Sequence, residues 1–218
     1  MRLAVNEPWI RWDWIESHTG RIGAALLQHV EFTVIAVGIG LILSVPIGLV
    51  AWHYYSTRSS ILSLAGALYT IPSLALFALL VPYTGLTVLT AEIGLVSYTL
   101  LILVRNIVVG LDGVPAEVRD AAQGMGFRTA RQLLRVELPL ALPVIMAGVR
   151  IATVTTIGLI TITALIGEGG LGQLILDGLN RDFRTPIVVG AALSIALAVV
   201  CDVALAMLQR LVTPWSRA

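Results

Sequence analysis

Five long stretches with almost no charged residues divide this sequence, and they constrain its fold more than any other feature. They lie between Glu31 and His53, Arg58 and Val81, Glu92 and Leu111, Leu138 and Ile166, and Pro186 and Leu208. A helix needs about 20 mainly apolar residues to cross the hydrocarbon core of a membrane. Because each stretch is close to this length, the sequence predicts an all-α integral membrane protein with about five transmembrane helices.

The composition agrees with a chain that lies almost entirely in lipid. Of its 218 residues, 57% are hydrophobic and 12% are charged, whereas about a quarter of the residues of an ordinary soluble domain are charged. No long polar block could fold as a separate soluble domain. We therefore expect an N-terminal lead-in at residues 1–22, one transmembrane domain at 23–212 and a short tail at 213–218.

The lead-in is not typical of a cleavable signal peptide, because it contains acidic residues and no apolar core. The acidic residues are Glu7, Asp13 and Glu16. It also contains three tryptophans, a residue type that settles at the level of the lipid headgroups. These are Trp9, Trp12 and Trp14.

Residue types that are missing or scattered exclude several functions. All fourteen basic residues are arginine, and the phosphate-binding loop of many ATPases requires a lysine that reaches the nucleotide phosphates. The formal net charge of +1 gives no reason to expect a nucleic-acid partner. Cys201 is alone, and His18, His29 and His53 lack the spacing of metal ligands. We therefore expect no catalytic site, no metal site and no cofactor in this chain.

The distribution of arginine predicts the orientation, since short cytoplasmic connections are enriched in basic residues. One side would hold Arg58, Arg119, Arg128, Arg131, Arg135, Arg210 and Arg217. The other side would hold fewer arginines, diluted by acidic residues: Arg2, Arg11, Arg21, Arg181 and Arg184. This bias places the N-terminus outside, and the C-terminus and the connection between the third and fourth stretches in the cytoplasm.

That connection is the one substantial polar segment within the transmembrane domain, and its pattern indicates two short helices. Pro115 suits the opening turn of the first, and Gly124 and Gly126 would end it. Thr129 and Gln132 suggest a capping box for the second helix. The first helix would carry an apolar stripe, because four residues recur at helical spacing. They are Val118, Ala121, Ala122 and Met125.

Two interpretations of this stripe are open. An amphipathic helix could lie on lipid headgroups, with Arg128, Arg131 and Arg135 facing anionic lipid. Alternatively, the helix could dock into a groove of a protein partner. The small side chains of Ala121 and Ala122 favour docking, because burying alanine in lipid gains little free energy.

Asp120-Ala121-Ala122, then Gly126, then Val136-x-Leu138-Pro139 reproduce the spacing of the signature E-A-A-x3-G-x9-I-x-L-P. On these residues the chain resembles type I importer permeases of the ATP-binding cassette class, with Asp120 in place of the usual Glu and Val136 in place of the usual Ile. The resemblance implies that segment 112–139 couples the permease to a separate ATPase subunit, which binds ATP and magnesium. The residues implied in this coupling are Glu117, Asp120, Ala121, Ala122, Gly126, Leu138 and Pro139.

A longer likeness narrows the family to permeases for glycine betaine, carnitine and choline. It runs through Thr70 to Leu76, Leu103 to Asn106, Glu137 to Arg150 and Gly167 to Gly172. It implies a bacterial inner-membrane importer with two permease subunits, identical or sibling, two ATPase subunits and an extracytoplasmic substrate-binding protein.

Two segments are candidates for the pathway or its gate. Pro72, next to Ser73, lies inside the second stretch, and a proline within a span is tolerated where neighbours or a cavity satisfy the freed backbone groups. We therefore expect a kinked helix beside a pathway. The second segment is Gly-rich, and we expect it to close the outer mouth or to meet the binding protein: Gly167, Glu168, Gly169 and Gly170.

Several alternatives are open from the sequence. The coupling signature is shared with permeases for methionine and other amino acids. An ion-gradient-driven carrier or a membrane anchor would explain the hydrophobicity equally well. For the charged residues within the spans, Arg105, Arg150 and Asp202, we expect ion pairing or contact with the membrane interface, and we expect Glu31 and Glu92 at headgroup level.

Overall fold

The computed structural model describes residues 8–217, and every regular element in this range is a helix. Four helical runs are long and apolar enough to cross a membrane: α2 (Thr19–His53), α5 (Val88–Asp112), Thr129–Ile166 and α10 (Arg184–Val212). The run Thr129–Ile166 joins α7 (Thr129–Gln132), a π-helix (Leu133–Glu137), α8 (Leu138–Thr163) and a 3-10 helix (Ala164–Ile166). A fifth span results if α3 (Tyr55–Thr70) and α4 (Ser73–Thr84) cross together. The prediction of an all-α membrane protein with about five spans is confirmed.

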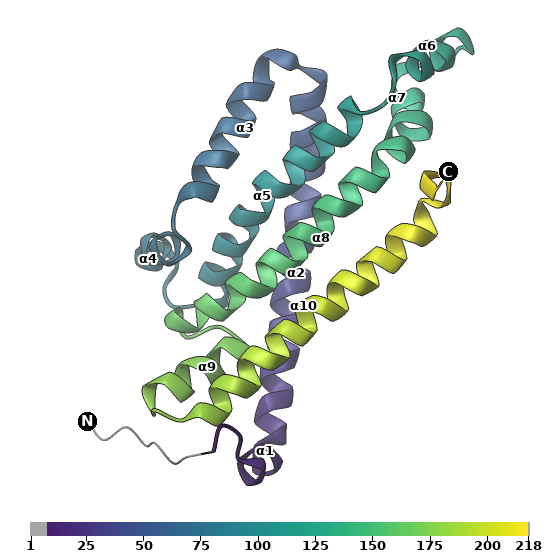
Figure 1. The fold of residues 1–218 in the computed structure, drawn as a ribbon. Coiled ribbons are helices and arrows are strands. Elements are labelled where there is room, and N and C mark those ends of the chain that lie inside the picture. The colour runs from purple at the N-terminus through teal and green to yellow at the C-terminus, as the bar shows by residue number, and fades with distance from the viewer. Residues whose placement is uncertain (1–7, 218) are drawn as a thin grey trace.

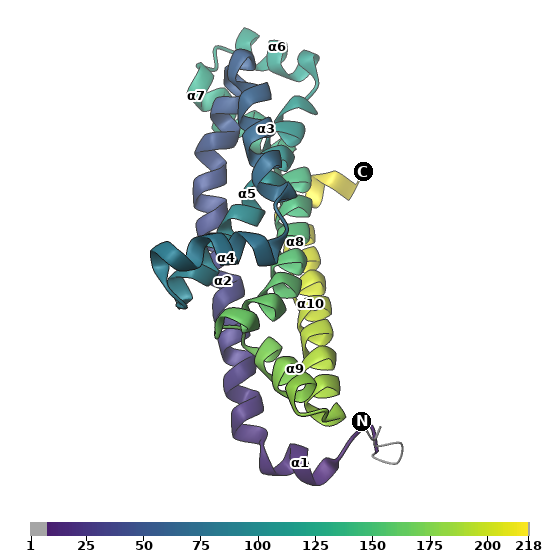
Figure 2. The same cartoon turned by 90° about the vertical axis from the view of Figure 1, so that its left-hand side faces the viewer.

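Apart from α4, the short helices gather at the two ends of the bundle formed by the long ones (Figure 1). Helix α6 (Ala116–Gly124) and α7 lie at one end, called here the α6 end, together with the last residues of α10. At the other end, the α9 end, lie α1 (Trp12–Ser17) and α9 (Leu171–Asn180). Figure 2 shows α4 projecting sideways from the bundle. The first described residues and the C-terminal 3-10 turn Pro214–Arg217 therefore lie at opposite ends of the molecule.

Small residues let α2 pack closely against α5. They recur every four positions on one face of α2: Ala36, Gly40, Ser44 and Gly48. A Cβ atom on Gly40 would lie 2.0 Å from Thr99 Oγ1, and one on Gly48 would lie 2.7 Å from Ile107 Cγ2. Small residues at four-residue spacing are a common way for membrane helices to approach, because lipid provides no hydrophobic drive for their association.

The second apolar stretch is broken in two. Helices α3 and α4 are bent by 93° at Ile71 and Pro72. A residue before proline avoids the helical conformation, and Ile71 accordingly has an extended ψ of 126°. The Tyr98 hydroxyl of α5 donates a hydrogen bond to the freed carbonyl of Ile71. The expectation of a single kinked helix was therefore wrong, since Pro72 separates two helices.

Of the two acidic residues expected at headgroup level, Glu92 is buried in protein, whereas Glu31 is exposed. Glu92 lies in the first turns of α5 with an exposed fraction of 8%. Its helix packs between α2 and α4, where Ala91 and Leu95 belong to a core cluster with Phe77. The sequence does not reveal this burial, because it depends on α4 folding sideways against α5.

Helix α2 begins at Thr19, well before Glu31, because the polar residues in between do not break the helix. The segment expected as a lead-in thus contains α1 and the first turn of α2, and its residues 1–7 lie outside the described residues. Helix α10 ends at Val212, and Ala218 also lies outside the described residues.

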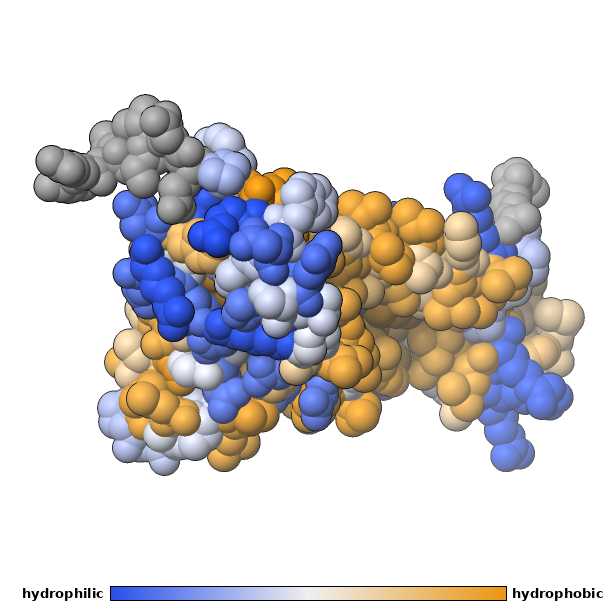
Figure 3. Space-filling view, turned by 90° about the horizontal axis from the view of Figure 1, so that it is seen from below, coloured by the Kyte–Doolittle hydropathy of each residue, from blue (hydrophilic) through white to orange (hydrophobic). Residues whose placement is uncertain are grey.

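The surface has the polarity of a membrane protein. Figure 3 views the molecule from the α9 end, where hydrophilic residues gather, and shows hydrophobic residues covering the flanks behind them. Large apolar side chains point outward on α2 and α10, among them Ile42, Val199 and Val200. These flanks suit contact with lipid or with another membrane-embedded chain.

Candidate functional site

Helix α6 ends in a Schellman motif at the glycine that the sequence singled out. The Gly126 N–H donates to the Gln123 carbonyl at 2.9 Å, and the Phe127 N–H donates to the Ala122 carbonyl at 3.1 Å. Gly126 has a φ of +80°, which side chains with a Cβ rarely adopt. A glycine is therefore needed here for the chain to turn from α6 into α7.

The apolar stripe of α6 is buried on one side and exposed on the other. Ala122 has an exposed fraction of 1% and packs inward against its own chain, whereas Met125 is 70% exposed. Ala121 is exposed beside Met125, and Glu117 and Asp120 are exposed near the start of the helix. Within the described residues, an apolar strip on α6 is therefore left uncovered.

A polar network holds α6 against the rest of the molecule. Arg119 Nη2 donates to the Leu111 carbonyl at the end of α5 at 2.6 Å. Arg119 Nε lies 3.9 Å from Glu137 Oε1, and Gln132 Nε2 donates to the same oxygen at 2.8 Å. The Arg119 guanidinium also lies 5.6 Å from the centre of the Trp52 ring. Three segments thus meet at Glu137, which is only 4% exposed.

The sequence does not reveal this network, and the predicted capping box of Thr129 and Gln132 is wrong. Arg128, not Thr129, is the residue before α7, and its side chain makes no capping bond. Gln132 binds Glu137 rather than closing a capping box. No sequence spacing indicates the Arg119–Glu137 contact, because the chain must fold back between the two residues.

The chain continues as one helical run from α7 into α8. The π-helix Leu133–Glu137 joins the two, and π-helical turns are rare and often lie at functional sites. Leu138 packs against a cluster that contains Ile107 and Ala141. Pro139 lies in the first turn of α8, so the helical run lacks one backbone N–H donor directly after the π-helix. Helix α7 is therefore continuous with a membrane span.

Replacing Arg119 by alanine should loosen α6. The change removes a hydrogen bond to the Leu111 carbonyl and leaves Glu137 with Gln132 alone. Hydrogen bonds of charged groups contribute about 1.5–3 kcal/mol, so amide exchange in α6 should speed up by roughly tenfold or more. Hydrogen exchange read by mass spectrometry measures this. The matched control is Arg128→Ala on the exposed part of the same segment, and equal exchange in both variants would refute the role of Arg119.

The Gly-rich turn lies near the α9 end, pressed between three helices. Gly170 has a φ of +50°, and a Cβ atom there would lie 2.8 Å from the Ala25 carbonyl oxygen of α2. A Cβ atom on Gly169 would lie 2.5 Å from the Ala164 nitrogen. Gly167, with a φ of +89°, is exposed. These glycines therefore serve close packing and turning.

Two side chains of α2, Gln28 and His29, bind this turn, and neither was predicted to do so from the sequence. Gln28 accepts from the Gly170 N–H at 3.2 Å and donates to Glu168 Oε2 at 3.0 Å. His29 is fully buried, and its Nδ1 accepts from the Leu171 N–H at 3.3 Å. Its Nε2 must then carry the hydrogen that is donated to the Ile157 carbonyl at 3.1 Å. Neutral His29 thus ties α2, α8 and α9 together.

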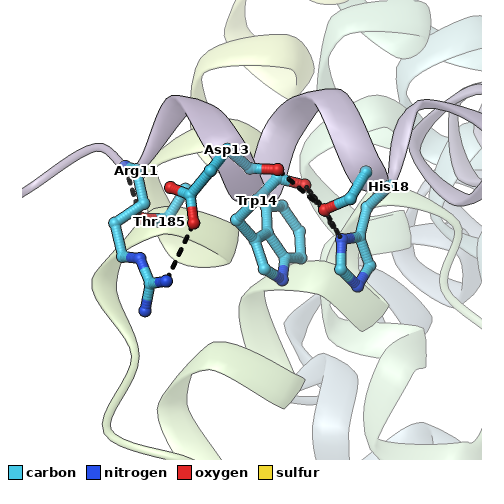
Figure 4. A network of polar contacts seen from close by, with 6 residues as sticks. Arg11, Asp13, Trp14, His18 and Thr185 are labelled. Carbon is cyan, nitrogen blue, oxygen red and sulfur yellow. Dashed lines mark hydrogen bonds and ion pairs between the residues drawn. The ribbon is translucent and has the colours of Figure 1, made fainter.

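The α9 end carries a second polar cluster (Figure 4). The Arg11 N–H donates to Thr185 Oγ1 at the start of α10 at 3.0 Å. The Arg11 side chain donates to Asp13 at 2.9 Å, and this hydrogen bond lowers the pKa of the Asp13 carboxyl. Trp14 stacks on His18 and meets the ring of Phe183 edge-on. Helix α1 is thereby fixed to the turn between α9 and α10.

The tryptophans of this end differ in their surroundings. Trp9 and Trp12 are each 68% exposed, as an interfacial position requires, whereas Trp14 packs against protein. A salt bridge joins Arg21 to Asp177 across α2 and α9. The α9 end is therefore a polar surface assembled from α1, α9 and the start of α10.

The charged residues within the spans are partly paired. Arg150 and Asp202 form a two-pronged ion pair between α8 and α10, with both N···O distances at 2.9 Å. Arg150 lies near the middle of α8. Arg105 is exposed on α5. Ion pairing was expected for Asp202, and its partner is Arg150.

Within residues 8–217, no three His, Cys, Asp or Glu side chains lie close enough to hold a metal ion.

A comparison with family models identifies the family of this chain. The model for the inner membrane component of binding-protein-dependent transport systems matches residues 32–214. The chain belongs to this family. It is therefore a multi-pass inner-membrane transport subunit, and the matched range includes α6, the π-helix and the Gly-rich turn.

Relatives within this permease family match almost the whole chain. The osmoprotectant import permease protein OsmW of Salmonella typhimurium is 38% identical over 202 residues, which cover 90% of this chain and 94% of that protein. The choline transport system permease protein OpuBB of Bacillus subtilis is 35% identical over 202 residues, covering 92% and 93%. The recognition of a permease of this kind from the sequence is confirmed.

Among solved structures, an inward-facing form of the MetNI methionine transporter has the same fold. The TM-score is 0.83 over 91% of this chain and 99% of that chain, at 19% identity. Identity this low shows the fold alone. The importer-permease architecture expected from the sequence is therefore confirmed.

Proposed function

We propose that this chain is the membrane-spanning subunit of an ATP-driven importer for quaternary-ammonium osmoprotectants such as glycine betaine, carnitine and choline. The observation that carries the proposal is the full-length likeness to OsmW and OpuBB, whose names state osmoprotectant and choline transport. The methionine alternative rests on a fold match at 19% identity, which carries no information about the solute. Family membership also favours binding-protein-dependent import over an ion-driven carrier.

The coupling role of segment 112–139 is part of this proposal. The uncovered strip of Ala121 and Met125 would dock into the ATPase subunit, with Glu117 and Asp120 at its edge. Ala122 packs the helix onto its own chain, and Gly126 gives the turn that α6 requires. Leu138 and Pro139 begin the span that would receive the movement. ATP and magnesium would bind to the ATPase subunit, which agrees with the missing lysine.

The same proposal gives the orientation and the remaining partners. The α6 end carries more arginines than the α9 end and would face the cytoplasm together with the C-terminus. The α9 end would face outward and meet the substrate-binding protein, with Glu168 near the contact. A second permease, identical or sibling, would complete the pathway beside Pro72, Ser73 and the turn Gly167–Gly170. This proposal is supported by the exposed apolar flanks of α2 and α10.

Uptake measurements in the organism that encodes the chain test the function. Deleting the gene should abolish accumulation of radiolabelled glycine betaine, carnitine or choline at high osmolarity, and the intact gene on a plasmid should restore it. Methionine uptake serves as the matched control and should not change. Loss of methionine uptake with normal uptake of all three quaternary-ammonium solutes would contradict the proposal. Purification of the tagged chain from native membranes should also recover an ATPase subunit.

A further inference from the structure

An open groove lies between α8 and α10, away from α6 and from the Gly-rich turn. Its volume is about 460 Å³, and it is lined by Ala147, Arg150, Ile151, Val154, Thr155 and Asp202. The α8 residues share one helix face, because they follow each other at spacings of three and four. We call this feature the Arg150–Asp202 groove.

The ion pair of this groove leaves hydrogen-bond donors of Arg150 available on the open side. Arg150 uses Nε and Nη2 to hold the two oxygens of Asp202, which leaves the N–H groups of Nη1 for another acceptor. The side chains of Arg150 and Asp202 are 31% and 38% exposed. Both charges are thus held in fixed positions and remain accessible from the groove.

The position of the pair makes contact of this face with lipid unfavourable. Arg150 lies near the middle of α8, and Asp202 lies several turns inside α10. A charged side chain is unfavourable at the centre of a membrane, and such residues face water-filled cavities or other protein. An accessible ion pair near the middle of two spans therefore indicates that this face meets water or another protein chain rather than lipid.

We propose that the Arg150–Asp202 groove binds a small zwitterionic solute during its passage through the membrane. The solute carboxylate would accept hydrogen bonds from the free N–H groups of Arg150, since guanidinium and carboxylate are complementary. The solute ammonium group would lie beside the Asp202 carboxylate. Ala147, Ile151 and Val154 offer apolar contacts to N-methyl groups. The groove volume lies within the range of about 300–1,000 Å³ that is common for small-molecule sites.

This inference rests on the proposed function for its solute class and sharpens it. A solute with both charges would engage both side chains, whereas a solute with an ammonium group but no carboxylate would engage Asp202 alone. Glycine betaine and choline differ in this way. They are therefore the probes that separate recognition by Arg150 from a purely structural role of the pair.

Thiol labelling tests whether the groove is wet. In a Cys201→Ala background, Thr155→Cys should react with a membrane-impermeant cationic methanethiosulfonate, and glycine betaine should slow the reaction. The matched control is Val200→Cys, which lies on the opposite side of α10 from Asp202 and is 63% exposed at the native valine. We expect Thr155→Cys to react about tenfold faster or more, because thiolates form in water and not in lipid. Equal rates, or cross-linking of Thr155→Cys between two copies in place of labelling, would overturn the proposal.

Uptake kinetics test the recognition. Arg150→Gln should raise the KM for glycine betaine by about tenfold or more, because a charged hydrogen bond to the carboxylate is lost. The KM for choline should change far less. Asp202→Asn should raise the KM for both solutes. The matched control is Arg58→Gln, which breaks the Arg58–Asp112 ion pair outside the groove and should affect both solutes equally.

The outcomes separate this inference from the proposed function. If Arg150→Gln lowers uptake of both solutes only in proportion to the amount of protein in the membrane, the pair is structural and the inference fails. If the unmodified chain transports neither solute, the proposed function fails, and the inference for this solute class fails with it. Thr155→Cys labelling would then still show whether the groove is wet.

Discussion

Solute uptake should be lost when Ala121 is replaced by tryptophan, although the protein should still fold and reach the membrane. Ala121 is exposed in this chain, so the larger side chain has room in the isolated subunit. At a docked surface, however, it would have to be accommodated by the ATPase partner. Overpacking of this kind costs about 1–3 kcal/mol, which corresponds to roughly ten- to hundredfold weaker association. Solute-stimulated ATP hydrolysis in reconstituted vesicles should fall with uptake.

The matched control is Gln123→Trp. Gln123 is also exposed on α6, but it lies on the other side of the buried Ala122 and outside the uncovered strip. We expect this variant to retain most of its uptake. If Ala121→Trp shows normal coupled transport while both variants are present in equal amounts, this strip does not dock to the ATPase subunit. A bulky residue at Ala122 is a poorer test, because it would disturb the packing of α6 on its own chain.

The second large effect is expected for Gly170→Ala, which should destabilise the folded protein. The positive φ of Gly170 costs a residue with a Cβ about 1–3 kcal/mol. The new Cβ atom would also lie 2.8 Å from the Ala25 carbonyl oxygen and from the His29 backbone nitrogen, and overpacking adds about 1–3 kcal/mol. For a chain of this size the sum corresponds to a decrease in Tm of roughly 5–20 °C. Thermal unfolding of the detergent-solubilised protein measures it.

Gly158→Ala provides the matched control for this prediction. Gly158 lies within α8, and a Cβ atom there would have nothing within 4 Å. Alanine is also a better helix former than glycine by about 1 kcal/mol. The Tm of this variant should therefore stay level or rise. If Gly170→Ala unfolds at the same temperature as Gly158→Ala, the close packing of the Gly-rich turn does not contribute to stability.

The membrane spans could be predicted because their signal is local. Each span must be apolar along its own length, so the stretches before His53, Leu111, Ile166 and Leu208 could be read without knowledge of their neighbours. The ends of the helices were predicted less accurately. Thr19 begins α2 well before the expected position, because a helix can continue into the interface, where Arg21 and Gln28 find polar partners.

The second span was predicted least well. Proline in a sequence indicates that a helix is disturbed, but it does not give the angle. The 93° bend at Pro72 depends on Tyr98 satisfying the Ile71 carbonyl and on α4 packing against α5. Both contacts join residues far apart in the sequence. The burial of Glu92 follows from the same packing and was missed for the same reason.

The five apolar stretches determined by themselves that this chain spans a membrane, because exposing so much apolar surface to water is unfavourable. The segment from Pro115 to Pro139 determined the permease family through residue type and spacing, which are properties of the chain alone. Only the tertiary structure decided that Ala121 points outward while Ala122 packs inward, and that Asp202 pairs with Arg150. The physical reason is that burial and pairing depend on the helices packed alongside, which sequence periodicity does not identify.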